Sequence, residues 1–163
     1  RSGTRTRPGR VAEIGGPGAA WEHYSADVTR TIPVSGTFSA REKELYELVL
    51  KASNAAIRQV KPGADYYNDV HMTAKKILDD AGYGQYFIHG TGHFLGLDVH
   101  DAGNYDLPLK AGVVVTVEPG IYIPEEGIGI RIEDDVAVTR DEPRILTDGL
   151  AKTADDIEAL MAA

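Results

Sequence analysis

Three of the chain's five histidines, His89, His93 and His100, fall within residues 89–101. Glycines at 90, 92 and 96 make a helix through this segment unfavourable, because an interior glycine costs roughly 1 kcal/mol relative to alanine. A glycine-rich, extended backbone can instead direct separate side chains to one point. Imidazole is a common metal ligand and proton carrier near neutral pH. The segment therefore predicts a metal or acid–base site, with three unrelated loop histidines as the alternative.

Two glutamates follow this segment in apolar, strand-like sequence. Glu118 lies in the run Val-Val-Val-Thr-Val-Glu-Pro-Gly at 113–120, and Glu133 lies in Gly-Ile-Gly-Ile-Arg-Ile-Glu-Asp-Asp at 127–135. A carboxylate in an apolar strand is costly to bury unpaired, so such a group normally pairs with a cation or binds a metal. The two glutamates thus favour a metal site. His71, in a predicted helix, is given no role.

The composition is that of one globular domain and argues against several classes of function. Of the 163 residues, 42% are hydrophobic and 26% are charged, and no apolar run approaches the roughly 18 residues of a membrane span. The net charge of −8 argues against a general nucleic-acid binder. The lack of cysteine excludes disulfides and thiolate zinc sites. We expect a cytoplasmic protein that binds neither nucleic acid nor membrane.

Two amphipathic helices are predicted in the first half of the chain. Ser39 followed by Glu42 has the spacing of a capping box, and the apolar residues after it repeat with helical spacing up to Pro62. A second helix is expected between a cap at Asp65 and a stop at Gly82. The apolar face of each helix is interpreted as core packing.

Strands are predicted before and after these helices. Residues 24–32 alternate and are rich in β-branched side chains, and four short strands follow between residues 113 and 139. We expect the four to form an antiparallel meander, which gives an α+β fold with one domain over residues 21–163. Residues 1–20, rich in Arg, Gly, Pro and Ala, are predicted to be an irregular or partly disordered lead-in.

Four motifs stand in order over the chain: Ser-Ala-Asp-Val-Thr-Arg-Thr at 25–31, His-Gly-Thr-Gly-His-Phe-Leu-Gly-Leu-Asp-Val-His-Asp at 89–101, Thr-Val-Glu-Pro-Gly-Ile-Tyr at 116–122, and Gly-Ile-Arg-Ile-Glu-Asp at 129–134. Together they resemble the motifs of the Xaa-Pro peptidases, the family of aminopeptidase P and prolidase. The resemblance covers about residues 21–150. It implies the pita-bread fold, an α+β architecture that this family shares with methionine aminopeptidase.

The resemblance also implies a dinuclear metal site, typically of manganese or cobalt, held by two Asp, one His and two Glu. The ligands carried over by position are Asp27, His93, Glu118 and Glu133. Carboxylate-rich ligation suits manganese, and cobalt and zinc also accept this donor set. By the same resemblance His89 and His100 would be catalytic, binding substrate and moving protons or steadying the tetrahedral intermediate. Arg131 would support a ligand carboxylate.

The chain departs from the family pattern at the first Asp ligand. That position lies eleven residues before Asp27, where this sequence has Gly16. Residues 1–26 contain no Asp, and Glu13 and Glu22 are the nearest carboxylates. No part of the sequence corresponds to the family's N-terminal half, so we expect an N-terminally truncated pita-bread domain that binds one metal ion or none.

Two kinds of function remain open at this point. One is a metal-dependent Xaa-Pro dipeptidase or aminopeptidase that acts on proline-containing di- or oligopeptides, with activity impaired by the missing Asp. The other is a non-catalytic pita-bread binding module, or an inactive truncated relic of such a peptidase. Because missing helices would leave apolar sheet surface bare, a homodimer is also expected.

Overall fold

The computed structural model describes residues 11–15 and 19–163, and side chains from residue 19 onward. The strands are β1 (Val11–Gly15), β2 (Ala20–Trp21), β3 (Tyr24–Ser25), β4 (Thr29–Pro33), β5 (Val114–Val117), β6 (Gly120–Ile123), β7 (Ile128–Arg131), β8 (Asp134–Ala137) and β9 (Arg144–Ile145). The helical segments are α1 (Ala40–Ile57), the π-helix η1 (Tyr66–His71), α2 (Met72–Asp80), the 3₁₀ helix η2 (Gly84–Tyr86) and α3 (Ala154–Met161). Of the predicted lead-in, residues 1–10 and 16–18 lie outside the described residues.

The strands are joined by antiparallel pairing into a curved sheet. β1 pairs with β4, β5 with β8, β6 with β7, and β9 with β8. A bridge between Thr29 and Glu133 connects β4 to the strand that leads into β8. A second bridge, between Phe94 and Val115, places the glycine-rich segment alongside β5. These two bridges bring three of the four motifs to one sheet.

The predicted meander is wrong, because the consecutive strands β5 and β6 do not pair with each other. The chain instead runs out along β5 and β6, turns, and returns along β7 and β8. Pro119 interrupts the outward path, since its ring nitrogen has no hydrogen to donate. Residues 132 and 133 interrupt the return path. Glu118 and Glu133 therefore lie at breaks in two long strands.

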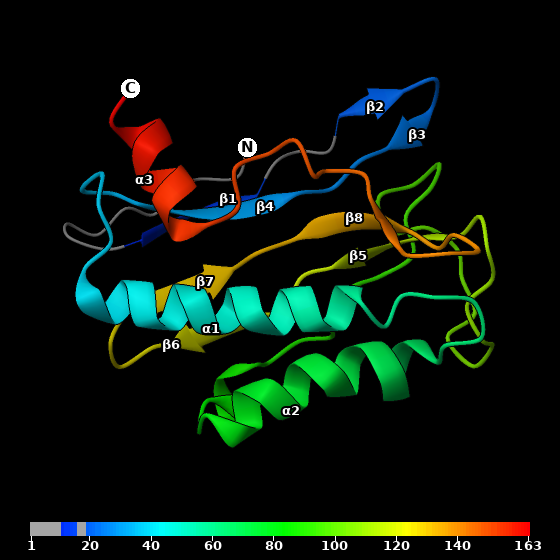
Figure 1. Ribbon diagram of the computed structural model, residues 1–163, viewed down its shortest axis with the longest axis horizontal. Helices are drawn as coiled ribbons and strands as arrows, with labels where there is room; N and C mark the ends of the chain where they lie inside the picture. The colour runs from blue at the N-terminus through cyan, green and yellow to red at the C-terminus, as the bar shows by residue number, and fades with distance from the viewer. Residues whose placement is uncertain (1–10, 16–18) are drawn as a thin grey trace.

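The single strand predicted over residues 24–32 is also wrong. β3 and β4 are separated by residues 26–28, and there the N–H of Asp27 donates to Asp135 Oδ2 (3.1 Å). β3 turns back on β2 to form a small hairpin that projects from the rest of the molecule (Figure 1). Asp27 therefore lies between β3 and β4, where its N–H is bound to a side chain of β8 and its carboxylate lies 3.5 Å from His93 Nε2.

α1 and α2 cover one side of the sheet (Figure 1). α1 begins where the sequence predicts, whereas the residues after the second predicted cap, Asp65, form the π-helix η1, and α2 begins only at Met72. Ser39 Oγ accepts from Glu42 N (3.3 Å), and Glu42 Oε2 accepts from Ser39 N (2.7 Å), which completes the capping box. Asp65 caps the segment that leads into α2, and Gly82 follows the end of α2 with a positive φ of 83°. The core between helices and sheet includes Leu45, Tyr46, Val49, Leu78, Val115, Val117, Ile121, Ile130 and Ile132.

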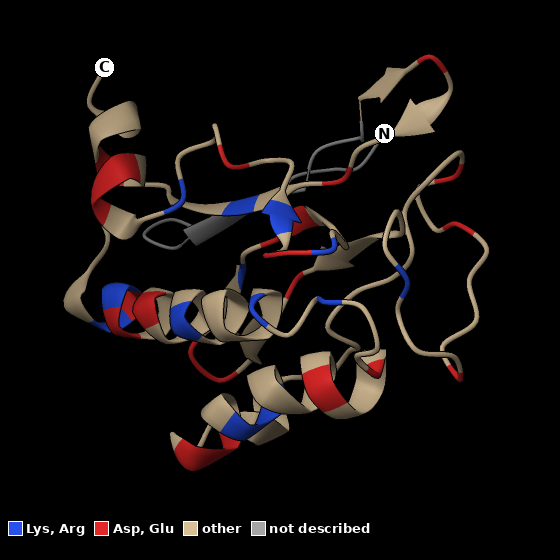
Figure 2. Cartoon of the chain, turned by 45° about the vertical axis from the view of Figure 1, so that its right-hand side comes forward, with Lys and Arg blue, Asp and Glu red and all other residues tan. Residues whose placement is uncertain are grey.

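Acidic and basic residues are interspersed along both α1 and α2 (Figure 2). Lys76 and Asp80, one turn apart on α2, pair at 2.9 Å, and Arg41 and Glu44 on α1 pair at 3.1 Å. Among the helices that the structure describes, none combines the length and the apolar character needed to cross a bilayer.

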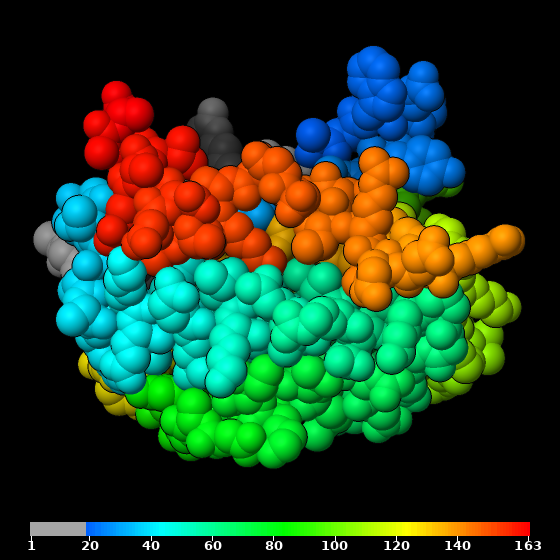
Figure 3. Space-filling model, viewed as in Figure 1, coloured from blue at the N-terminus to red at the C-terminus, as the bar shows by residue number. Residues whose placement is uncertain are grey.

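The segment after β9 packs along α1, where it forms a continuous band of surface (Figure 3). Tyr46 OH donates to Lys152 O (2.8 Å), and Lys152 Nζ donates to Asn54 Oδ1 (3.1 Å). α3 follows directly and is capped by Thr153, whose Oγ1 accepts from Asp156 N (3.1 Å). This band ties the end of the described chain to the first long helix.

Loss of the capping box should weaken the whole fold, because α1 supplies much of the core. We expect Ser39→Ala to lower the free energy of unfolding by about 1 kcal/mol, measured by urea denaturation. The control is Lys51→Ala, an exposed position on the same helix, which should change it by less than about 0.5 kcal/mol. Equal effects of the two substitutions would contradict a role for the box.

Candidate metal centre

The four predicted ligands lie on four segments that backbone hydrogen bonds hold side by side: Asp27, His93, Glu118 and Glu133. The N–H of Glu133 donates to Thr29 O (3.0 Å), which sets the strand of Glu133 against the one that follows Asp27. Thr116 N donates to His93 O (2.8 Å), and Glu118 N donates to Thr91 O (2.6 Å). The glycine-rich segment is thus fixed along β5, with His93 beside Glu118.

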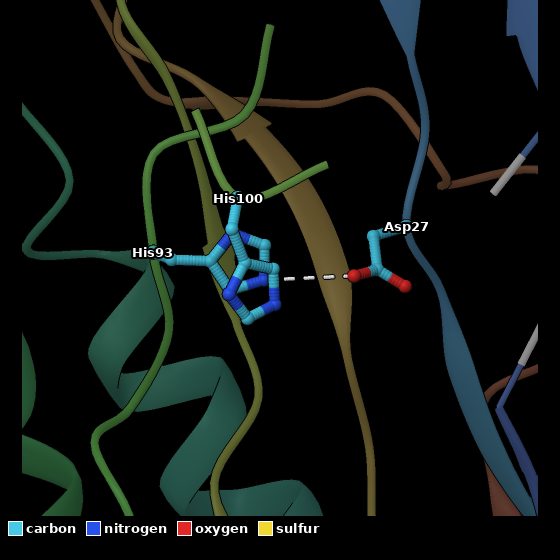
Figure 4. A group of neighbouring side chains, drawn as sticks. All are labelled: Asp27, His93 and His100. Carbon is cyan, nitrogen blue, oxygen red and sulfur yellow. Dashed lines mark ion pairs between the residues drawn. The ribbon is translucent and has the colours of Figure 1, made fainter. Parts of the chain in front are cut away.

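The side chains of these residues converge. His93 Nε2 lies 3.5 Å from Asp27 Oδ2 and 3.6 Å from Glu118 Oε1. Possible ligand atoms of His93, Glu118 and Glu133 lie within 4.8 Å of one another, and so do those of Asp27, His93 and His100. Figure 4 shows His93 facing Asp27, with the ring of His100 against that of His93. Since both groups contain His93, this ring stands at the middle of the cluster.

Glu133 is the most deeply buried of the four predicted ligands, with 2% of its surface exposed. Thr29 Oγ1 donates to its Oε2 (2.5 Å), whereas Oε1 has no hydrogen-bond partner among the described residues. Burial, with the nearby charges of Glu118 and Asp27, raises the pKa of Glu133 to about 7. A buried carboxylate oxygen without a donor, facing other carboxylates and an imidazole, fits a site for a divalent cation.

The ring of His93 is oriented as a metal ligand requires. Its Nδ1 lies 3.0 Å from the carbonyl oxygen of Phe94, a contact in which the nitrogen must be the donor. In the neutral ring the proton is then on Nδ1, and the lone pair of Nε2 points at Asp27 and Glu118. A backbone carbonyl that fixes the tautomer in this way is a common partner of metal-bound histidine.

The two histidines predicted to be catalytic take different positions. His100 is exposed and stacks on His93, with ring centroids 3.9 Å apart. His89 is connected to the cluster by a series of hydrogen bonds between polar side chains. Its Nε2 lies 3.0 Å from Tyr122 OH, and Arg131 Nη1 donates to the same hydroxyl (3.2 Å).

Arg131, predicted to support a ligand carboxylate, lies between this chain and the acidic groups. Its Nε donates to Thr29 Oγ1 (3.2 Å), whose own hydroxyl donates to Glu133, and lies 3.8 Å from Glu118 Oε2. The hydrogen bonds therefore run from His89 through Tyr122 and Arg131 to the ligands. Sequence reasoning missed Tyr122, although it ends the 116–122 motif.

Asp135 is a second residue that sequence reasoning missed. Its carboxylate accepts from the N–H of Asp27 and so holds the break between β3 and β4. Burial, partly offset by that hydrogen bond, raises the pKa of Asp135 to about 6. Only its place beside Glu133 in the sequence could have drawn attention to it.

A pocket of about 520 Å³ opens beside His89, between η1 and residues 87–92. Its walls are largely aromatic, from Tyr66, Tyr67, Phe87 and Tyr105. His71, to which the sequence analysis assigns no role, also lines it, and its Nδ1 lies 2.8 Å from Thr91 Oγ1. Burial lowers the pKa of His71. His71 and Thr91 are 20 positions apart in the sequence, so no local pattern could predict this contact.

The position of the missing Asp ligand cannot be placed on this geometry. Gly16 lies outside the described residues, as do the side chains of residues 11–18. Glu22, one of the two nearest carboxylates in the sequence, is exposed in the β2–β3 turn with a φ of 48°.

The raised pKa of Glu133 makes stability depend on pH when no metal is bound. Between about pH 4.5 and 7 the folded protein binds a proton that the unfolded chain releases, so the free energy of unfolding falls as the pH rises. The fall is on the order of 3 kcal/mol. In Glu133→Gln this decrease in the free energy of unfolding should be absent. The measurement is urea denaturation at a series of pH values with a chelator present. Exposed Glu125→Gln is the control, and identical pH profiles for all three proteins would contradict the assignment.

Comparison with known proteins identifies the family of the chain. The family model described as metallopeptidase family M24 matches residues 17–140. Xaa-Pro aminopeptidase 1 of Streptomyces coelicolor is 41% identical over 174 residues, covering 86% of this chain and 35% of the relative. Xaa-Pro dipeptidase of Pyrococcus furiosus is 44% identical over 134 residues, covering 80% of this chain and 38% of the relative.

Solved structures show the same likeness. Pseudomonas aeruginosa aminopeptidase PepP superposes with a TM-score of 0.86 and 38% identity, covering 93% of this chain and 41% of that one. Prolidase from Pyrococcus furiosus gives 0.77 and 40%, covering 84% and 41%. The chain thus spans about two fifths or less of these proteins, and the predicted α+β pita-bread fold is confirmed over that part. On its motifs, its fold and the match of the family model, the chain belongs to metallopeptidase family M24.

Proposed function

We propose that this chain carries the catalytic centre of a metal-dependent Xaa-Pro peptidase, an enzyme that hydrolyses the peptide bond before proline. The observation that carries the proposal is the convergence of Asp27, Glu118 and Glu133 on the ring of His93, together with the unpartnered buried Oε1 of Glu133. The similarity to Xaa-Pro aminopeptidases and dipeptidases supports the substrate class.

Each predicted residue then has a role that its contacts support. When bound, a divalent ion polarises a carbonyl and lowers the pKa of water, which supplies the nucleophile. His100, exposed at the mouth of the cluster, is placed to exchange protons with substrate and solvent. Tyr122 OH donates to His89 when the His89 ring is neutral, because His89 Nδ1 donates to Gly90 O (2.7 Å). His89 is thereby held toward the substrate side of the centre.

The aromatic pocket beside His89 offers a place for the apolar part of a substrate. Proline rings pack well on aromatic faces, and ligand pockets combine such walls with a few polar groups. Here His71 and Thr91 supply polar groups on one side of the pocket. A proline-containing di- or oligopeptide fits this chemistry.

We propose one ion per chain, with manganese favoured because three of the four ligands are carboxylates. Cobalt and zinc remain acceptable to the same donors. A second ion would need the carboxylate that this chain lacks at Gly16. That same substitution favours a second candidate function, a pita-bread module that binds a partner without catalysis.

Metal content tests both candidates. After dialysis against Mn²⁺, elemental analysis should find about one ion in the unaltered chain, more in Gly16→Asp, and almost none in His93→Ala. Hydrolysis of an Xaa-Pro dipeptide and of a longer Xaa-Pro peptide should rise with ion content. Absence of bound ion in both the unaltered chain and Gly16→Asp would contradict the peptidase proposal and favour the binding module.

We further propose that the chain forms a homodimer through an apolar patch made by Trp21, Tyr24 and Leu97. These side chains are 80%, 65% and 60% exposed, and the N–H of Ser25 donates to Gly96 O (2.7 Å), which joins the β2–β3 hairpin to the loop of Leu97. Large exposed apolar groups gathered in this way commonly contact another protein.

Sedimentation velocity at micromolar concentration tests the dimer. The unaltered chain should sediment as a dimer, and Trp21→Ser with Leu97→Ser should shift it to a monomer. Leu160→Ser, at a position 64% exposed on α3, is the matched control and should leave the dimer intact. A monomer before any substitution would remove the proposal.

A further inference from the structure

Arg30 lies on β4, three residues after Asp27, and its guanidinium group binds three backbone carbonyls. Nη1 donates to Thr29 O (3.0 Å) and to Glu133 O (2.6 Å), and Nε donates to Ala151 O (2.8 Å). Thr29 and Glu133 form the bridge that joins β4 to the strand of Glu133. The Arg30 side chain therefore binds both strands of this bridge, close to the predicted ligands Asp27 and Glu133.

The remaining nitrogen of Arg30 binds a fully buried carboxylate. Asp134, with 0% of its surface exposed, accepts from Arg30 Nη2 (2.7 Å) and Thr147 Oγ1 (2.7 Å), and Lys152 Nζ lies 2.5 Å from its other oxygen. Burial opposes ionisation, but Lys152 and Arg30 outweigh it and hold the pKa of Asp134 below its ordinary value. The cluster is thus a buried ion group with two cations and one anion.

This ion group connects the site to the band of chain that follows β9. Ala151, Lys152 and Thr147 all belong to that band, and Lys152 is itself held to α1 through Tyr46 and Asn54. The two strands at the centre are therefore attached, through Arg30 and Asp134, to a segment that carries no predicted ligand.

Arginine is suited to this arrangement in a way that lysine is not. Its planar guanidinium presents five donors in fixed directions, whereas an ammonium group is a single point of charge on a flexible chain. A lysine at this position could still pair with Asp134. It could not also hold the carbonyls of Thr29, Glu133 and Ala151 in their present relation.

We propose that Arg30, tied down by Asp134 and Lys152, is a positioning residue of the metal centre that sets Asp27 and Glu133 at the spacing an ion requires. This inference rests on the proposed function, since it concerns the same centre. Arg30 touches none of the four predicted ligand side chains. Its effect acts through the backbone, because it holds the carbonyl of Glu133 itself and that of Thr29, two residues after Asp27.

The test compares Arg30→Lys with a matched control, Arg41→Lys. Arg41 also makes a two-pronged contact: its Nε donates to Glu126 Oε2 (2.8 Å) and its Nη2 donates to Glu126 Oε1 (2.6 Å). It lies on α1, away from the centre. Two measurements are made on each protein: affinity for Co²⁺ from its visible absorption, and amide hydrogen exchange of the metal-free protein. Thermal unfolding shows that each variant is folded.

We expect Arg30→Lys to remain folded, because Asp134 keeps two cations nearby. Its affinity for Co²⁺ should fall by about 10- to 100-fold, the usual effect of losing a group that orients a ligand. In the metal-free protein, amides of residues 26–33 and 130–136 should exchange about tenfold faster, with other segments unchanged. Arg41→Lys should alter neither property of the centre.

A folded Arg30→Lys with unchanged Co²⁺ affinity and unchanged exchange would overturn the proposal. If Arg30→Lys does not fold, Arg30→Gln combined with Asp134→Asn removes both charges of the pair and is tested in the same way. Failure of the unaltered chain to bind Co²⁺ would overturn the proposed function instead. The exchange measurement would still decide whether Arg30 holds the two strands together.

Discussion

Strand register at the bridge between Thr29 and Glu133 governs where the acidic side chains of the centre point. Successive side chains alternate between the two faces of a strand, so a slip of one residue would turn Glu133 away and bring Ile132 or Asp134 into its place. The N–H of Glu133, the hydroxyl of Thr29 and the guanidinium of Arg30 all act at this one crossing. The curvature of the sheet and the position of the glycine-rich segment matter to the centre only if this register is kept.

Three consecutive residues near this bridge, Glu133, Asp134 and Asp135, carry buried carboxylates whose negative charges are compensated to different degrees. Asp134 is buried between Arg30 and Lys152 and stays ionised. Asp135 is given a backbone N–H from Asp27, which only partly offsets its burial. Glu133 receives one hydroxyl and faces other acids, so its charge is the least compensated. Cation binding at Glu133 would relieve a repulsion that the structure otherwise leaves in place.

Local sequence was sufficient for the helices, because caps such as Ser39 with Glu42, and Thr153, act within one turn. Local sequence did not predict the strands correctly, because their pairing depends on residues that are far apart in the sequence. The strand predicted through Asp27 is broken because a side chain 108 residues away takes the Asp27 N–H, and the meander is replaced by β5–β8 pairing. The motifs predicted which residues could form a centre. They could not supply the contacts of Tyr122 or His71, which depend on how distant segments fold together.

The carbonyl oxygen of Phe94 accepts two hydrogen bonds, and these link the predicted metal ligand His93 to the predicted catalytic residue His100. It accepts from Nδ1 of His93, and it also accepts from the N–H of Asp101 (3.0 Å), which closes the loop that ends beside His100. Opening of that loop would free one lone pair of the carbonyl and carry His100 away from His93. The electron-donating strength of the His93 ring and the position of the His100 ring are therefore coupled through the peptide carbonyl of Phe94.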